Sequence, residues 1–548
     1  MSKMLEQLGA RFKAGLVKTS VKTASQWAEQ YRVMGKPYPG PWTFKHHPWT
    51  RGMLDAQDEL IVGQKAAQMG FTEVALNRTF YAIDVLGESV LYVLPASTPD
   101  ATDFSTSRFD PALELSTHLQ TLFSDVKNIG HKRAGSANLF IRGSRSKSQL
   151  KSIPVANVVL DELDEMVQEN ISLVFERTSG QIDKHVFMLS TATIDDYGIN
   201  KYYKESSQDH FFFRCPSCSK QIELTFPNCI VITSDDWNNP AIYDTHIICP
   251  ECKATLPHAG KSDFLQTGQW VPSLTNRVTR GFHINQLYST TIKPYQFATS
   301  YLKGLQNPAD EQEFYNSKLG VTHIVEGAKL TDENLQSCMA NRPRVQQRPN
   351  GNLITMGVDV GKWLHVTINS WHIGEGPDVS MAAQAVLLDH KKVLNFEDLD
   401  AIMHDYRVDF CVIDANPERR KALEFAQRFW GRVKLCFYAT GINSKNISVH
   451  SEEEHTISVD RTSWLDLSLG RVRRQKIILP SSVDMEFKSA LKSLVRIYET
   501  DNNGNPIGKY VCTDSNKGDH YAHALNYAEI ALPLALGMGQ SQDIKEKV

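Results

Sequence analysis

Acidic side chains end an apolar run in the first third of this sequence. In VANVVLDELDEM the run closes on Asp161 and Glu162. An aspartate at the end of a strand can hold Mg²⁺ beside a nucleotide, and a glutamate next to it can orient the water that attacks the terminal phosphate. A charge cluster at a helix N-terminus is the alternative interpretation of the pair. Phosphate chemistry also needs a phosphate-binding loop earlier in the chain.

That loop is predicted at residues 64–72, QKAAQMGFT, which follow the apolar run ELIVG. A phosphate-binding loop needs glycine where backbone amides approach the phosphates, a lysine that neutralises charge and a hydroxyl that holds Mg²⁺. Gly70 and Thr72 match that spacing, whereas Lys65 stands at the first glycine position and Phe71 at the usual lysine position. An ordinary strand-to-helix turn is the alternative for this half-matched spacing.

A third apolar run, HVFMLSTAT, ends in hydroxyl-bearing residues around Thr191. Hydroxyls at this place are expected to sense the γ-phosphate and couple its loss to motion. The three strand ends, taken in this order, favour ATP hydrolysis.

The stretch from His131 to Leu160 contains no acidic residue, although the formal net charge of the chain is -3. Its basic residues are Lys132, Arg133, Arg142, Arg145, Lys147 and Lys151. They could bind DNA phosphates or supply a catalytic arginine, and a solvated surface loop is the alternative.

Four of the nine cysteines form two CxxC pairs, Cys215 with Cys218 and Cys249 with Cys252. Each pair follows an apolar run and precedes a lysine, which is the spacing of a zinc ribbon. Four thiolates leave no open position on Zn²⁺, so we expect a structural site within about residues 211–257. Four reduced, buried cysteines without metal are the alternative.

A second set of carboxylates lies in the C-terminal part. Asp359 stands inside the apolar run ITMGVDV, where an unpaired charge would be costly, and Asp414 ends FCVIDAN. Carboxylates on neighbouring strands can hold the paired Mg²⁺ or Mn²⁺ ions that cleave phosphodiesters. A helix cap is the alternative for Asp414. A third ligand is expected from the helical stretch GDHYAHALNYA, which offers Asp519, His520 and His523.

The surrounding pattern predicts the elements that position these groups. Short apolar runs alternate with helical stretches at 46–200, as in a parallel α/β sheet. After the polar stretch ANRPRVQQRPNGN, three consecutive strands, a helix and a fourth strand give the order of a ribonuclease H fold. We therefore expect an N-terminal basic helical arm (1–45), an ATPase domain (46–200), a continuation and linker region with the zinc-ribbon insert (201–340), a nuclease domain (350–535) and a tail (536–548).

The sequence indicates neither a membrane role nor secretion. The apolar run IALPLALGM is too short to span a bilayer, and the N-terminus lacks the pattern of a signal peptide. We expect a protein that stays in a reducing compartment, where cysteines bind metal rather than form disulfides.

The early lysine of the loop, LDELDEM and STAT together resemble the motor domain of lambda-type tailed-phage terminase large subunits. That resemblance implies that an aromatic residue of HPWTRGMLDA, Trp49, stacks on adenine, and a core position is the alternative for this tryptophan. It also implies an insert similar to a zinc ribbon after the motor. The closing helix is similar to the family pattern DHxxDAxxYA, from which it departs because His523 stands at the usual aspartate. Imidazole there would shift metal preference towards Mn²⁺.

The resemblance implies ATP-driven packaging of double-stranded DNA into procapsids and metal-dependent cleavage of concatemers, in the host cytoplasm. The expected partners are a terminase small subunit, the portal protein and further copies in a ring. Two rivals remain: a transposase or integrase with the same nuclease core, which would not need Asp161 and Glu162, and a DNA-binding scaffold with a zinc ribbon that no longer hydrolyses ATP.

Overall fold

The computed structural model describes residues 21–123, 126–151, 153–340, 343–344, 352–374, 382–439, 447–451, 455–500, 506–514 and 518–537. Within it the chain forms two compact units, residues 1–323 and 324–548. Residues 1–20 of the predicted arm, most of the polar stretch after residue 340 and most of the predicted tail lie outside the described residues.

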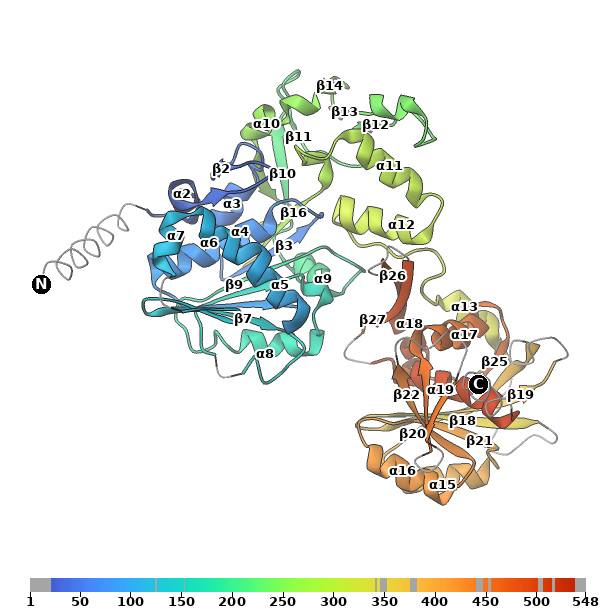
Figure 1. Ribbon diagram of the computed structural model, residues 1–548. Helices are drawn as coiled ribbons and strands as arrows, with labels where there is room; N and C mark the ends of the chain where they lie inside the picture. Colours follow the sequence, from blue (N-terminus) through green and yellow to red (C-terminus); the bar gives the residue numbers. More distant parts are fainter. Residues whose placement is uncertain are drawn as a thin grey trace, which may run out of the picture. The chain divides into compact units, whose positions relative to one another are not determined.

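A mixed, largely parallel sheet forms the centre of unit 1 (Figure 1). Its strands, in spatial order, are β11 (Gln221–Ile222), β10 (Asp209–Arg214), β16 (Arg280–Ile284), β3 (Leu60–Lys65), β9 (His185–Ser190), β8 (Asn157–Asp161), β4 (Val90–Leu94), β7 (Ala137–Gly143), β6 (His131–Ala134) and β5 (Val126–Asn128), with β15 (Gln269–Pro272) beside β10. The strands from β10 to β7 are parallel. Their C-terminal ends therefore meet at one edge, as predicted for β3, β8 and β9.

Apolar residues fill both faces of this sheet, because β3, β4, β8 and β9 are buried along almost their whole length. The helices of unit 1 are α2 (Ala24–Tyr31), α3 (Thr50–Asp55), α4 (Phe71–Tyr81), α5 (Thr102–Phe104), α6 (Asp110–Leu115), α7 (Thr117–Leu122), α8 (Ile171–Phe175), α9 (Gly198–Glu205), α10 (Lys261–Phe264), α11 (Pro294–Gly304) and α12 (Pro308–Glu313). Helix α4 begins at Phe71, within the last residues of the predicted loop.

The region 201–323 is part of unit 1. Strand β16 pairs with β3, and β10 pairs with β16, so this region extends the sheet of the predicted ATPase domain. A small three-stranded sheet, β12 (Ile230–Val231), β13 (His246–Ile248) and β14 (Thr255–Leu256), lies between the two CxxC pairs and just after the second. The boundary between the two units, at residue 323, lies within the predicted continuation and linker region 201–340.

Unit 2 is built on a nine-stranded sheet. The strands, in spatial order, are β17 (Met339–Ala340), β25 (Ile477–Pro480), β20 (Gln384–Val393), β19 (Leu364–His372), β18 (Leu353–Val360), β21 (Phe410–Asp414), β22 (Val433–Ala439), β24 (Thr456–Asp460) and β23 (Ser448–Ser451). Strands β18, β19 and β20 form an antiparallel meander, and β21 returns parallel to β18 after helix α15 (Phe396–Asp405). The predicted order of strands and helices is present.

The remaining elements of unit 2 are α13 (Asp332–Cys338), α16 (Arg419–Arg428), α17 (Arg461–Arg473), α18 (Met485–Ser493), the hairpin β26 (Leu494–Thr500) and β27 (Pro506–Cys512), and α19 (His520–Ala535). Helix α19 packs directly on β18. A Cβ atom at Gly357 would lie 2.0 Å from the carbonyl oxygen of Ala524, so glycine is what allows this close approach. None of the described helices is long and apolar enough to cross a membrane.

Candidate functional sites

A cavity of about 530 Å³ lies where β3, β8 and β9 end. Of the predicted nucleotide-binding residues, its lining includes Lys65, Gly70, Phe71, Thr72 and Thr191, and the predicted catalytic Glu162 joins them. The cavity is large enough to hold a nucleotide. The structure therefore brings together the three predicted strand ends.

The loop between β3 and α4 turns through two residues with left-handed backbone, Gln68 at φ 60° and Gly70 at φ 83°. Gly70 caps α4, so the first amides of this helix face the cavity end of the loop. Phe71 is almost completely buried, and its ring packs against Gly63 of β3. Its side chain serves the core, which explains why lysine is absent from that position.

Lys65 and Glu162 form an ion pair, with 2.9 Å between Nζ and Oε1. The lysine is buried, and burial alone would lower its pKa; the nearby carboxylates of Glu162 and Asp161 outweigh this and raise it. Lys65 is therefore a positive charge fixed at the position where the loop begins. Glu162 itself has left-handed backbone, φ 59°, and a side chain that is 41% exposed.

Asp161 lies buried behind the cavity wall and accepts a hydrogen bond from Tyr92 Oη at 2.6 Å. Burial and the charge of Glu162 raise its pKa to about 6, against the opposing effects of Lys65, Tyr92 and Thr72. Its Oδ1 has no hydrogen-bond partner within the described structure. A free carboxylate oxygen beside the Thr72 hydroxyl fits the oxygen ligands that Mg²⁺ prefers.

Sequence reasoning missed Asp164, which connects the ends of β8 and β9. Its carboxylate accepts hydrogen bonds from the Thr193 amide at 2.9 Å, the Thr193 hydroxyl and the Ile199 amide at 2.7 Å. Its own amide donates to Ser190 Oγ at 3.1 Å. Burial raises the Asp164 pKa to about 7. The loop that carries Glu162 is thus tied to the STAT segment.

The expectation for Trp49 needs correction. Trp49 has no exposed surface, its Nε1 donates to the carbonyl oxygen of Met69 at 2.9 Å, and its ring packs edge-on against Phe211 and Tyr288. A ring with no free face cannot stack on adenine, so Trp49 takes the core position that was its alternative. Besides Phe71, the aromatic residues that line the cavity are Tyr38, Trp42, His46 and His47. In the sequence, His46 and His47 stand close to Trp49 in HHPWT, and these rings could have been considered as the cavity lining in its place.

The basic segment does not supply the arginine of the cavity. Lys132 is buried and paired with Asp110 at 2.8 Å, while Arg142 donates to the carbonyl oxygen of Ile141 at 2.9 Å. The arginine in the lining of the described cavity is Arg108, an exposed residue between α5 and α6. Nothing in its local sequence marked it.

The four cysteines of the CxxC pairs converge, with their Sγ atoms all within 4.8 Å of one another. The pairs Cys215 with Cys252 and Cys218 with Cys249 lie 3.9 and 4.0 Å apart. Two equivalent turns present them, since the amides of Ser219 and Lys253 each donate to the carbonyl of the first cysteine of their pair. Four thiols around one point fit a tetrahedral Zn²⁺.

In unit 2 the two predicted strand carboxylates are adjacent. The parallel register pairs Val358 with Ile413, which places Asp359 and Asp414 at the next position of β18 and β21. Burial raises the Asp414 pKa to about 6, and the charge of Asp359 adds to this against a hydrogen bond from the Asn416 amide. Two carboxylates that interact in this way fit a shared divalent cation.

The three candidate metal ligands predicted at the closing helix have different partners. His520 Nδ1 lies 2.8 Å from Asp359 Oδ2. His523 Nε2 instead lies 3.1 Å from Asp519 Oδ2, and its Nδ1 lies 2.9 Å from Tyr438 Oη. Burial raises the pKa of Asp519, but His523 and then Arg461 outweigh it and lower that pKa to about 2. The geometry therefore selects His520 as the residue of this helix that joins Asp359.

Two family models match the chain. Residues 36–270 match the phage terminase large subunit gpA, ATPase domain, and residues 279–449 match the terminase large subunit gpA, endonuclease domain. Together they cover well over half of the sequence, including the cavity of unit 1 and both strand carboxylates of unit 2. No curated protein matches the chain in sequence.

The comparison with solved structures also finds large terminases. The crystal structure of the HK97 bacteriophage large terminase is 9% identical, with a TM-score of 0.48, over 94% of this chain and 99% of that chain. The large terminase of the thermophilic bacteriophage D6E in complex with ADP is 11% identical, with a TM-score of 0.29, over 86% of this chain and 93% of that chain. Because both TM-scores lie below 0.5, family membership rests on the two sequence families. This chain belongs to the large subunits of tailed-phage terminases, which hydrolyse ATP to package DNA and cleave it with an endonuclease domain.

Proposed function

We propose that unit 1 is the motor and that its nucleotide lies in the cavity at the ends of β3, β8 and β9. The observation that carries this proposal is the meeting of Lys65, Asp161 and Glu162 at one edge of a parallel sheet. Lys65 would bind the β- and γ-phosphates, and Thr72 with Asp161 would hold Mg²⁺. Bound Mg²⁺ would neutralise charge on the phosphate oxygens.

Glu162 would orient the attacking water in this motor. Its side chain borders the cavity and reaches Lys65, so it lies beside the place where the γ-phosphate is expected. The hydrogen bonds of Asp164 to Thr193 and Ile199 would carry a change at the phosphate to helix α9. Such a link is what converts hydrolysis into motion of the protein.

We propose that unit 2 is a nuclease with a ribonuclease H-like core, in which Asp359 and Asp414 hold divalent metal. When bound, the metal would activate water and stabilise the leaving oxygen. The meander followed by a parallel strand, with a carboxylate in its first strand and another at the end of the parallel one, supports this assignment. A transposase or integrase would share this core, but it would not need the cavity of unit 1.

We propose that the cysteine cluster is a zinc ribbon with a structural role, since four thiolates leave no position for substrate. By analogy with its family, the protein would act in the host cytoplasm on double-stranded DNA. It would bind a terminase small subunit and the portal, and assemble as a ring when it translocates DNA.

The proposal is tested by steady-state ATP hydrolysis and plasmid cleavage on the full chain. We expect DNA-stimulated hydrolysis that Glu162→Ala removes, and Mn²⁺-dependent cleavage that Asp359→Ala removes. Absence of hydrolysis in the wild type, even with DNA, would favour the scaffold instead. Equal cleavage by Asp359→Ala would show that the nuclease site lies elsewhere.

A further inference from the structure

Three side chains from three different elements of unit 2 converge on one point. Asp359 of β18 and His365 of β19 are cross-strand neighbours in the antiparallel register, and His520 begins α19. One ligand atom from each lies within 4.8 Å of the other two. The rings of His365 and His520 are stacked, with centroids 4.7 Å apart. The fold thus brings His520, far along the chain, beside Asp359 and His365.

His365 has a buried nitrogen without a partner. Its Nδ1 makes no hydrogen bond in the described structure, and the residue as a whole is 4% exposed. A buried polar atom of this kind is costly unless a ligand completes it. On the other side of the ring, Nε2 lies 3.6 Å from Glu486 Oε1. A carboxylate behind an imidazole is the usual way to orient a histidine that binds metal.

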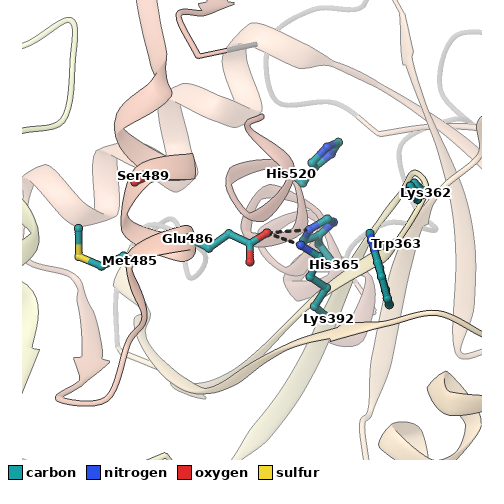
Figure 2. Close-up of a pocket in the computed structure, with 8 residues that line it drawn as sticks. All are labelled: Lys362, Trp363, His365, Lys392, Met485, Glu486, Ser489 and His520. Atoms are coloured by element: carbon teal, nitrogen blue, oxygen red, sulfur yellow. Dashed lines mark hydrogen bonds and ion pairs between the residues drawn. The ribbon is translucent and has the colours of Figure 1, made fainter. Parts of the chain in front are cut away.

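The two histidines border a cavity of about 470 Å³. Lys362, Trp363 and Lys392 line the same cavity, and Figure 2 shows Glu486 linked to both His365 and Lys392. The cavity gives access for a phosphodiester, and the lysines supply the positive charge that DNA requires. A metal held by three protein ligands would keep open positions for water and substrate.

We propose that Asp359, His365 and His520 bind a first-row transition-metal dication, with Mn²⁺ as the probe, in preference to Mg²⁺. The proposal rests on the nuclease function proposed for unit 2: of the two carboxylates assigned there it uses Asp359, and it adds His365, which the sequence did not indicate, as a ligand. Two imidazoles and one carboxylate suit transition metals, whereas Mg²⁺ takes oxygen ligands almost exclusively. The His523 ring, already held by Asp519 and Tyr438, is not needed.

The test is pulsed electron paramagnetic resonance of Mn²⁺ bound to the full chain, loaded with zinc and free of nucleotide. Nitrogen modulation of the Mn²⁺ echo reports an imidazole ligand directly. We expect modulation in the wild type, weaker modulation in His365→Gln and in His520→Gln, and none in the double variant. Each single variant should also weaken Mn²⁺ binding at least about tenfold, and Mg²⁺ binding less. His372→Gln, an exposed position at the end of the same strand, should match the wild type.

Unchanged nitrogen modulation in both single variants would overturn the proposal. Circular dichroism confirms that each variant is folded, and His520, whose side chain is 44% exposed, offers a second readout should His365→Gln fail to fold. Plasmid cleavage by Asp359→Asn separates this outcome from failure of the nuclease function. If Asp359→Asn loses cleavage while His365→Gln keeps its modulation, the nuclease stands and the histidine ligand does not. If Asp359→Asn cleaves like the wild type, the nuclease site itself is misplaced.

Discussion

Lys65 at the end of β3 and Glu162 just after β8 hold each other in an ion pair, with Nζ and Oε1 2.9 Å apart. The cation expected to bind phosphate and the carboxylate expected to orient water are therefore bound to one another. A phosphate group that binds Lys65 must compete with the carboxylate of Glu162 for the lysine ammonium. That competition would release the carboxylate when nucleotide binds, so that water is oriented only beside a bound phosphate.

Opposite effects on binding and hydrolysis follow from this pair. Glu162→Gln should lower the rate of ATP hydrolysis by about 100-fold or more while ATP binds at least as tightly, because Lys65 loses its competing partner. Lys65→Ala should instead weaken ATP binding. The measurements are a fluorescent-nucleotide titration and steady-state hydrolysis, with the exposed Glu169→Gln as control. If Glu162→Gln hydrolyses ATP at the wild-type rate, Glu162 does not orient the attacking water.

Arg108 should contribute to hydrolysis because it lines the cavity proposed to hold the nucleotide. An arginine that stabilises charge on the transferring phosphate is worth about 100-fold or more in rate. Arg108→Ala should lower kcat by that order and change nucleotide affinity little. Arg145→Ala, an exposed arginine of the basic segment, is the matched control. A large loss in Arg145→Ala with none in Arg108→Ala would return the catalytic arginine to that segment.

The cysteine cluster should contain ~1 zinc ion per chain, measured by elemental analysis of the purified protein. Cys249→Ser should lose that zinc and unfold at a lower temperature, because Cys249 is buried in the cluster and a serine hydroxyl does not supply the thiolate that Zn²⁺ binds. Cys512→Ser, in unit 2, should keep it. Full zinc content in Cys249→Ser would show that these thiols do not hold the metal.

Lys261 should make unit 1 more stable as the pH rises. Its side chain is buried, with Nζ donating to the carbonyls of Leu287 and Ser289 at 2.6 and 2.8 Å, and burial lowers its pKa to about 7. Between that pKa and the ordinary value of 10.5, the unfolded chain binds the proton more tightly than the folded one. The contribution of Lys261 to the free energy of unfolding therefore increases as the pH rises from about 7 to 10.5, and it decreases as the pH falls through that range.

Urea unfolding of the wild type and Lys261→Met at pH 7.5 and pH 9 measures this effect. The wild type should gain on the order of 1–2 kcal/mol relative to Lys261→Met across that interval. Lys303→Met, an exposed lysine of α11, should show no such difference. Parallel pH dependence of wild type and Lys261→Met would contradict the lowered pKa.

Strand ends were predictable because apolar runs that stop at polar residues mark them directly. Asp161, Asp359 and Asp414 lie where those runs indicated, and CxxC spacing located the cysteine cluster. Parallel strands bring their ends to one edge whatever lies between them. Local pattern was therefore sufficient for these groups.

Residues brought in by tertiary packing were not predictable in this way. Trp49 is in the core because Phe211 and Tyr288, far along the chain, cover its ring. Arg108 and His365 enter their sites through packing and through cross-strand register, and neither stands in a motif. The pairing of β16 with β3 depends on contacts that local composition does not record.

The central claim is that one chain contains two independent phosphate-cleaving sites, one in each unit. The most direct measurement is ATP hydrolysis and plasmid cleavage assayed side by side for the wild type, Glu162→Gln and Asp359→Asn. We predict that Glu162→Gln loses hydrolysis and keeps Mn²⁺-dependent cleavage, while Asp359→Asn loses cleavage and keeps hydrolysis. A folded variant that loses both activities would contradict the claim. So would the result that both variants keep both activities.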